Sequence, residues 1–182
     1  AKKGALAGEF HLYFMDETTL GLHPVLRACW MKRGEQRRID TPGQQQWYHL
    51  FGAYNFVTDD VIAMPSAKKN SDAFVAFLDT MVAQAPDDKP LLFVLDNASY
   101  HRSAMATAGF AVVEGRLKPL FLPPYCSMLN PIERYWGHLK DSACANKLYP
   151  SMDELVDSVL VNLRKQNDHS NPKRFSICKD LQ

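Results

Sequence analysis

The chain has few cysteines, and they form no pattern that would bind a metal. Four are present; no two have C-x-x-C spacing and none stands beside a matching pair of histidines, which argues against a zinc site. An even count permits disulfides, but the first residues lack the apolar core of a signal peptide. No apolar run approaches the length of a membrane span. We therefore expect a cytoplasmic protein with reduced thiols and no membrane partner.

The chain also lacks an excess of charge of either sign. The net charge is +1, so the field of the whole chain does not indicate a nucleic-acid partner, and the local basic groups are read first as solvated surface. With 182 residues, 46% of them apolar, the chain suits one domain with a substantial core. The absence of an initiator Met suggests a fragment of a longer protein. We expect a single catalytic domain over residues 1–182.

Three common catalytic motifs are absent as well. The sequence contains no G-x-x-x-x-G-K-[ST] loop, no G-x-S-x-G elbow and no H-E-x-x-H segment. These absences argue against nucleotide hydrolysis by a P-loop, a serine hydrolase and a zinc protease.

The hydrophobic pattern predicts strands alternating with helices. Residues 91–95 are apolar throughout, as in a parallel strand covered on both faces, and the spacing of apolar residues after Ser71 is that of an amphipathic helix capped by Ser71. Asn130 and Ser151 are expected to cap two later helices. The predicted strands are residues 10–15, 46–55, 61–64, 91–95 and 117–122, and the predicted helices start at Ser71, near residue 103, at Asn130-Pro131 and at Ser151. The fold class is a mixed α/β sheet flanked by helices.

Two of these strands are expected to end directly in an aspartate, Asp16 and Asp96. Taken singly, either could be a turn residue or a helix cap. In open α/β sheets, however, ligands bind outside the carboxyl ends of strands. If the two strands are parallel neighbours, both carboxylates emerge at the same edge.

Glu133 is the third acidic candidate. It stands three residues after Asn130, where a glutamate is also favoured simply as a capping partner and by the helix dipole. It lies about 100° around the helix from the apolar stripe of Ile132, Trp136 and Leu139, at the border of the buried face. From there it can reach a sheet edge. Trp136 itself is expected in the core rather than as a platform for base stacking.

Three carboxylates in one cleft repel one another unless a cation joins them. Mg²⁺ prefers carboxylate oxygens, and two such ions about 3.5–4 Å apart can activate a nucleophile and stabilise a leaving oxygen in phosphoryl transfer.

Other polar residues are weaker candidates. Glu17 should point away from Asp16, which favours a place at the surface or a supporting role over ligation. His101 and Arg102 could meet a phosphate or assist proton transfer, or could be exposed loop residues.

At these residues the chain resembles the catalytic domain of a DDE transposase of the mariner-type superfamily, in its bacterial insertion-sequence branch. Three segments carry the resemblance: residues 14–18 (Phe-Met-Asp-Glu-Thr), residues 94–102 around Asp96, and residues 122–136, with their prolines, Asn130 and Trp136. The resemblance covers roughly residues 10–140.

The resemblance implies a ribonuclease H-like fold, with a three-strand antiparallel part plus parallel strands. It also implies that Asp16 bridges two Mg²⁺ ions, for which Mn²⁺ can substitute, while Asp96 and Glu133 hold one each. The substrate would be double-stranded DNA: the ends of a transposon, cleaved by activated water, and the target DNA that the freed 3′-OH attacks. The full-length protein would carry an upstream helix-turn-helix region, act as a homodimer and associate with the bacterial nucleoid.

Two alternatives stay open from the sequence. One is a ribonuclease H-like nuclease or resolvase that only hydrolyses DNA. The other is an inactive, domesticated copy that serves as a DNA-binding or assembly module, which the presence of all three acidic residues disfavours.

Overall fold

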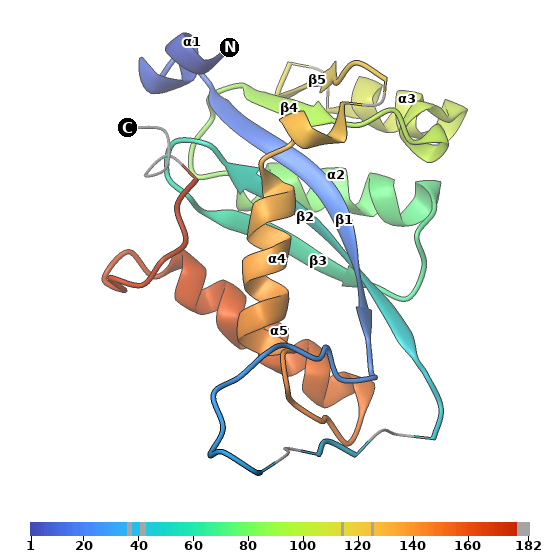
Figure 1. The fold of residues 1–182 in the computed structure, drawn as a ribbon. Helices are drawn as coiled ribbons and strands as arrows, with labels where there is room; N and C mark the ends of the chain where they lie inside the picture. Colours follow the sequence, from blue (N-terminus) through green and yellow to red (C-terminus); the bar gives the residue numbers. More distant parts are fainter. Residues whose placement is uncertain (36–37, 41–42, 114, 125, 178–182) are drawn as a thin grey trace.

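The computed structural model describes residues 1–35, 38–40, 43–113, 115–124 and 126–177. Five strands form one sheet in the order β3-β2-β1-β4-β5 (Figure 1). The strands are β1 (His11–Gly21), β2 (Trp47–Asn55), β3 (Val61–Ser66), β4 (Leu91–Leu95) and β5 (Leu117–Phe121). None of the helices in the described ranges is both long and apolar enough to cross a membrane.

The sheet joins an antiparallel half to a parallel half along β1. β1 pairs antiparallel with β2, and β2 with β3, whereas β1, β4 and β5 run parallel. β4 therefore lies between two parallel neighbours, as its unbroken apolar sequence predicted. β5 is an edge strand and carries Pro119, a residue that an edge tolerates because no further strand needs its missing N–H. The mixed sheet with a three-strand antiparallel part is confirmed.

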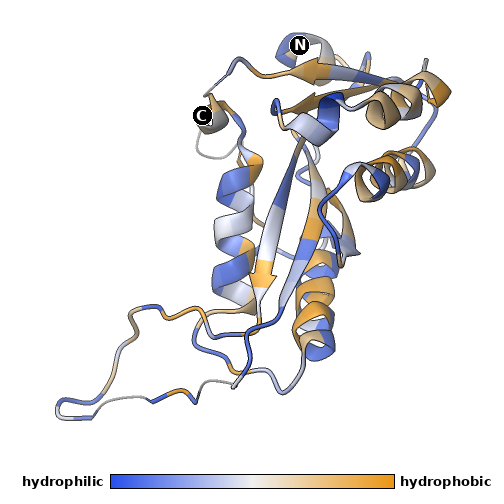
Figure 2. Ribbon diagram, turned by 90° about the vertical axis from the view of Figure 1, so that its right-hand side faces the viewer, coloured by the Kyte–Doolittle hydropathy of each residue, from blue (hydrophilic) through white to orange (hydrophobic). Residues whose placement is uncertain are grey.

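Helices cover both faces of the sheet (Figure 1). α4 (Ile132–Ala143) and α5 (Met152–Asn167) pack on one face, and α2 (Ser71–Gln84) and α3 (Ala104–Val112) on the other. Three short helices, α1 (Lys2–Leu6), η1 (Ser99–Arg102) and η2 (Ser127–Leu129), complete the fold. Figure 2 shows the described residues that follow β1, up to residue 35, reaching away from the sheet.

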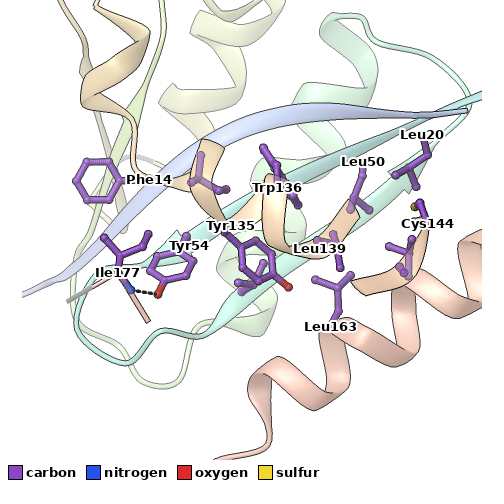
Figure 3. Close-up of a cluster of buried hydrophobic side chains, with 14 of the residues drawn as sticks. Phe14, Leu20, Leu50, Tyr54, Tyr135, Trp136, Leu139, Cys144, Leu163 and Ile177 are labelled. Atoms are coloured by element: carbon purple, nitrogen blue, oxygen red, sulfur yellow. Dashed lines mark hydrogen bonds between the residues drawn. The ribbon is translucent and has the colours of Figure 1, made fainter. Parts of the chain in front are cut away.

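The apolar stripe of α4 is the centre of the core on its face. Trp136, Tyr135 and Leu139 pack against strand residues such as Phe14 and Leu50 (Figure 3). Trp136 is 4% exposed, which confirms that it is a core residue. The indole ring lies directly on Gly52 of β2, where a Cβ would collide with it. Because Gly52 is paired with Asp16 of β1, the packing of α4 brings that helix over the Asp16 region of the sheet.

Asp16 does not end its strand, contrary to the prediction. β1 continues to Gly21, because β2 supplies antiparallel partners along its whole length, from Asn55 opposite Tyr13 to Trp47 opposite Gly21. Only the parallel partner β4 stops early, at Leu95. Asp16 thus lies in the middle of β1, at the level where one of its two neighbouring strands ends.

Two predicted helix caps were also wrong. α2 is capped by Asn70, whose side chain accepts a hydrogen bond from the N–H of Ala73, and Ser71 is the first helical residue. α4 has Pro131 at its N-cap position with no side-chain cap: the Nδ2 of Asn130 donates to Met15, and its Oδ1 has no hydrogen-bond partner among the described residues. The Ser151 cap is confirmed: its hydroxyl accepts from the N–H of Glu154.

Candidate active site

The pairing of β1 with β4 brings Asp16 and Asp96 to the same level of the sheet. Phe14 pairs with Val94 in parallel register, and Asp16 and Asp96 each follow two residues later. Side chains two residues apart in a strand share a face. Phe14 belongs to the core beneath α4, so Asp16 faces the same side as that helix. The sequence-based expectation that these two strands are parallel neighbours is confirmed.

Asp16 is held in a setting that disfavours its charge. Burial and the neighbouring carboxylate of Glu17 raise the pKa of Asp16 to about 7, and Asp96 adds to the rise. Lys69 and a backbone hydrogen bond oppose the shift without cancelling it. A partly buried carboxyl beside like charges is the arrangement that a bound cation relieves.

Asp96 is held more firmly and stays ionised. Its Oδ1 accepts a hydrogen bond from the N–H of Ala98 at 2.9 Å and lies 2.9 Å from Nδ1 of His101. The latter contact is an ion-pair separation rather than an aligned hydrogen bond, since Nδ1 has no hydrogen-bond partner among the described residues. The contact with His101 lowers the pKa of Asp96, against partial burial. About half of the side chain, 48%, remains open to solvent.

Glu17 lies on the opposite face of the sheet, as predicted, but it is buried rather than at the surface. Its side chain is 2% exposed and meets three donors: the Tyr100 hydroxyl at 2.5 Å, Nε2 of His101 at 2.9 Å and Nζ of Lys69 at 3.3 Å. Burial raises the pKa of Glu17, but these partners outweigh it, so the pKa is lowered overall. Its carboxylate is therefore charged inside the core.

His101 connects the two faces. Burial alone would lower the pKa of His101, but Asp96 at one ring nitrogen and Glu17 at the other raise it to about 9. The ring is then an imidazolium at neutral pH, with both nitrogens protonated. Its side chain is 1% exposed. This placement joins it to Asp96 and Glu17; the predicted contact of His101 with a phosphate stays a prediction.

Glu133 lies in the first turn of α4, over the same face as Asp16. It is exposed and lines a hollow beside Phe14 and Asn130. It does not join the two aspartates in one cluster: in the described part of the chain, no three His, Cys, Asp or Glu side chains lie close enough together to hold a metal ion. The structure thus brings two of the three predicted ligands to one level and leaves the third on the neighbouring helix.

The donor set nevertheless suits a divalent cation of the Mg²⁺ type. All three residues offer carboxylate oxygens, and two of them already repel each other across adjacent strands. Both contacts that Asp96 makes fall on Oδ1, so Oδ2 has no partner within the described residues. Asp16 and Asp96 could hold the ion, with Glu133 supplied from α4.

Two side-chain amides tie the loops to the strands through contacts that the sequence pattern did not predict. The Nδ2 of Asn130 donates to the backbone carbonyl oxygen of Met15 at 2.8 Å, and the amide of Asn97 donates to the carbonyl oxygen of Leu122. Asn130 and Asn97 thus anchor the start of α4 and the turn after Asp96. The acceptors are backbone atoms distant in sequence, so no local motif could have pointed to them.

The Arg102 side chain, the other predicted phosphate contact, is exposed near the end of β5. Its guanidinium lies 4.8 Å from the centre of the Phe121 ring. An exposed arginine held against an aromatic ring beside the Asp96 turn suits a phosphate contact, which stays a prediction.

Residues 11–156 match the family model described as DDE superfamily endonuclease. The chain belongs to this family. The predicted resemblance to mariner-type DDE transposase domains of the insertion-sequence branch is confirmed. The insertion element IS630 uncharacterized 39 kDa protein of Shigella sonnei is 29% identical over 153 residues, which cover 84% of this chain and 44% of that protein. The chain therefore spans less than half the length of this curated relative.

Solved structures with the same fold include two of the Mos1 transposase. The Mos1 strand transfer complex matches with a TM-score of 0.65 at 14% identity, over 88% of this chain and 49% of that one. The Mos1 transposase catalytic domain with raltegravir and Mg matches with a TM-score of 0.58 at 13% identity, over 84% of this chain and 70% of that one. At such identities the likeness concerns the fold, and it confirms the ribonuclease H-like class.

Proposed function

We propose that this DDE endonuclease chain is the catalytic domain of a transposase, which cuts DNA at transposon ends and transfers the freed 3′ end to target DNA. The observation that carries the proposal is the parallel register of β1 and β4, which brings Asp16 and Asp96 to one level of the sheet, with Asp16 on the face that α4 covers. The family match supports the endonuclease activity, and the relative from an insertion element supports the transposition step.

Asp16, Asp96 and Glu133 are the proposed ligands of Mg²⁺ or Mn²⁺, two ions in all. Bound there, the ions would lower the pKa of the attacking hydroxyl and neutralise the charge that develops on the scissile phosphate. Asp16 would hold metal from the middle of β1, and Asp96 would offer Oδ2 while Oδ1 stays held by Ala98. Glu133 would approach from the first turn of α4, and exposed Arg102 would contact the DNA backbone.

The partners of the proposed reaction are double-stranded DNA at the transposon ends and at the target. Mos1 has been solved as a strand transfer complex and as a paired-end complex with the left transposon end. By analogy we propose that the whole protein pairs two ends as a homodimer and works at the bacterial nucleoid. This step rests on the likeness of the fold to that of Mos1.

The test is Asp96→Asn in an assay of Mg²⁺- or Mn²⁺-dependent nicking of end-containing DNA. The variant should lose nicking while its circular dichroism and unfolding midpoint stay near those of the wild type. Asp79→Asn, a like change at an exposed site on α2, should nick normally. Unchanged cleavage by Asp96→Asn would overturn the assignment.

Supplying DNA with a pre-formed 3′-OH end together with a target plasmid separates the two enzyme functions. Joined products support transposition, whereas hydrolysis without joining supports a nuclease or resolvase. If the wild type neither cleaves nor joins DNA, that result supports the inactive assembly module.

A further inference from the structure

The buried Glu17 carboxylate calls for an explanation. Placing a charge in a protein core costs several kcal/mol unless partners compensate it. Glu17 packs on the α2 and α3 side of the sheet, where a hydrophobic residue would fill the space without that cost. Three donors, Tyr100, His101 and Lys69, are instead gathered around it from two separate segments of the chain.

His101 is fixed in place by its neighbours as well as by Glu17. The centre of its ring lies 4.5 Å from that of Phe74 on α2 and 4.4 Å from that of Tyr100. The backbone N–H of His101 donates to the carbonyl oxygen of Ala98, which closes the short helix η1. The ring therefore has little freedom to turn, and the direction in which Nδ1 points is set by the core.

Nδ1 lies within ion-pair distance of the carboxylate that the proposed mechanism needs. It lies 2.9 Å from Oδ1 of Asp96, the same oxygen that accepts from the N–H of Ala98. One hydrogen bond and one ion-pair contact both fall on Oδ1, so rotation of the Asp96 carboxylate about its Cβ–Cγ bond is restricted. Glu17 is in turn the group that holds Nε2 of His101.

We propose that Glu17 is a positioning residue, which acts through His101 to fix the Asp96 carboxylate for divalent-metal binding. This inference rests on the proposed function, in which Asp96 is a metal ligand. Glu17 is not itself a ligand, because it lies on the face of the sheet away from Asp16 and its side chain is 2% exposed. Partners behind a metal ligand orient it, and their loss typically lowers metal affinity roughly 10–100-fold.

The primary experiment is a Mn²⁺ titration of the purified chain, followed by electron paramagnetic resonance of free Mn²⁺. Glu17→Gln keeps the size of the side chain and removes its charge. We expect its dissociation constant for Mn²⁺ to rise roughly tenfold or more, with far-UV circular dichroism unchanged. Asp79→Asn, the same chemical change at an exposed site on α2, should bind as the wild type does.

The outcomes separate this inference from the proposed function. If the wild type binds Mn²⁺, Asp96→Asn does not, and folded Glu17→Gln binds normally, then Glu17 has no positioning role while the proposed function stands. If the wild type binds no Mn²⁺ at these carboxylates, the proposed function fails and the positioning role falls with it.

A milder variant decides the question if Glu17→Gln does not fold. Tyr100→Phe removes one donor to Glu17 and leaves every charge in place. We expect its dissociation constant for Mn²⁺ to rise about threefold, and its nicking rate to recover at saturating Mn²⁺. A purely structural role would lower the rate at every Mn²⁺ concentration without moving half-saturation. An unchanged dissociation constant in Tyr100→Phe would then overturn the proposal.

Discussion

The side-chain amide of Asn130 donates a hydrogen bond to the backbone carbonyl oxygen of Met15, across 2.8 Å and 115 positions in the chain. Met15 directly precedes Asp16, and Asn130 lies three residues before Glu133. This single buried contact therefore couples the strand that carries one proposed ligand to the helix that carries another. The Asn130 side chain thus anchors the start of α4 through Nδ2 and makes no cap hydrogen bond to that helix.

Replacing Asn130 should affect stability and activity together. Asn130→Ala removes the hydrogen bond and leaves the buried carbonyl oxygen of Met15 with one partner fewer, so we expect a loss of about 1–3 kcal/mol in the free energy of unfolding. Urea denaturation measures it. Nicking should fall more than the folded fraction does, because the start of α4 loses its anchor. A normal rate in the folded variant would contradict this coupling.

Gly52 should tolerate no side chain. A Cβ at this position would collide with the indole ring of Trp136, so Gly52→Ala should displace α4 and cost roughly 1–3 kcal/mol of stability. Trp136 is buried, whereas Trp30 and Trp47 are exposed. Trp136 therefore emits at the shortest wavelengths, and this part of the fluorescence spectrum reports on its contact with Gly52. The emission should shift to the red in Gly52→Ala. Adding Trp136→Leu should recover part of the loss, and strictly additive losses would argue against a direct clash.

The raised pKa of Asp16, about 7, predicts a pH dependence of stability. A carboxyl whose pKa is higher in the folded state than in the unfolded state favours folding below its unfolded pKa, and this contribution is lost as pH rises through 7. Asp16→Asn should therefore be more stable than the wild type at pH 8, by about 1–3 kcal/mol after allowance for solvent screening. At pH 4 the difference should vanish. Urea unfolding at both pH values measures it, and an equal difference at both would contradict the assigned pKa.

Added Mg²⁺ should reduce the stability difference between Asp16→Asn and the wild type at pH 8. A cation that binds only the folded, ionised site stabilises the wild type at pH 8 and does little at pH 4, where Asp16 is protonated. Asp16→Asn should respond weakly at either pH. Thermal unfolding with Mg²⁺ or with a chelator measures the effect, and equal stabilisation of both proteins would place the cation elsewhere.

The Ser151 cap offers a variant that affects stability alone. Ser151→Ala removes the hydrogen bond from the N–H of Glu154 and should cost about 1 kcal/mol. Helix α5 packs beside α4 on the same face of the sheet, against β3, and contributes none of the proposed ligands. The nicking rate of the folded protein should therefore be unchanged; a drop beyond the folded fraction would show that α5 supports the site.

The sequence predicted the features of the fold and site that depend on neighbouring residues, and it missed those that depend on contacts between residues far apart in the chain. The all-apolar residues 91–95 predicted a central parallel strand, because burial on both faces leaves a local signature. The continuation of β1 past Asp16 could not be predicted, since it depends on pairing with β2 across a long loop. The alternation along β1 placed Glu17 on the face away from Asp16, yet its burial depends on Tyr100 and His101, more than 80 positions away.

The central claim is that Asp16 and Asp96 hold divalent metal beneath α4. A crystal structure of the protein soaked in Mn²⁺, with the ion located by its anomalous scattering, tests it most directly. The account predicts Mn²⁺ bound between the carboxylates of Asp16 and Asp96, with Glu133 turned in from α4 to complete the site. Mn²⁺ bound elsewhere, with these two carboxylates empty at saturating concentration, would contradict it.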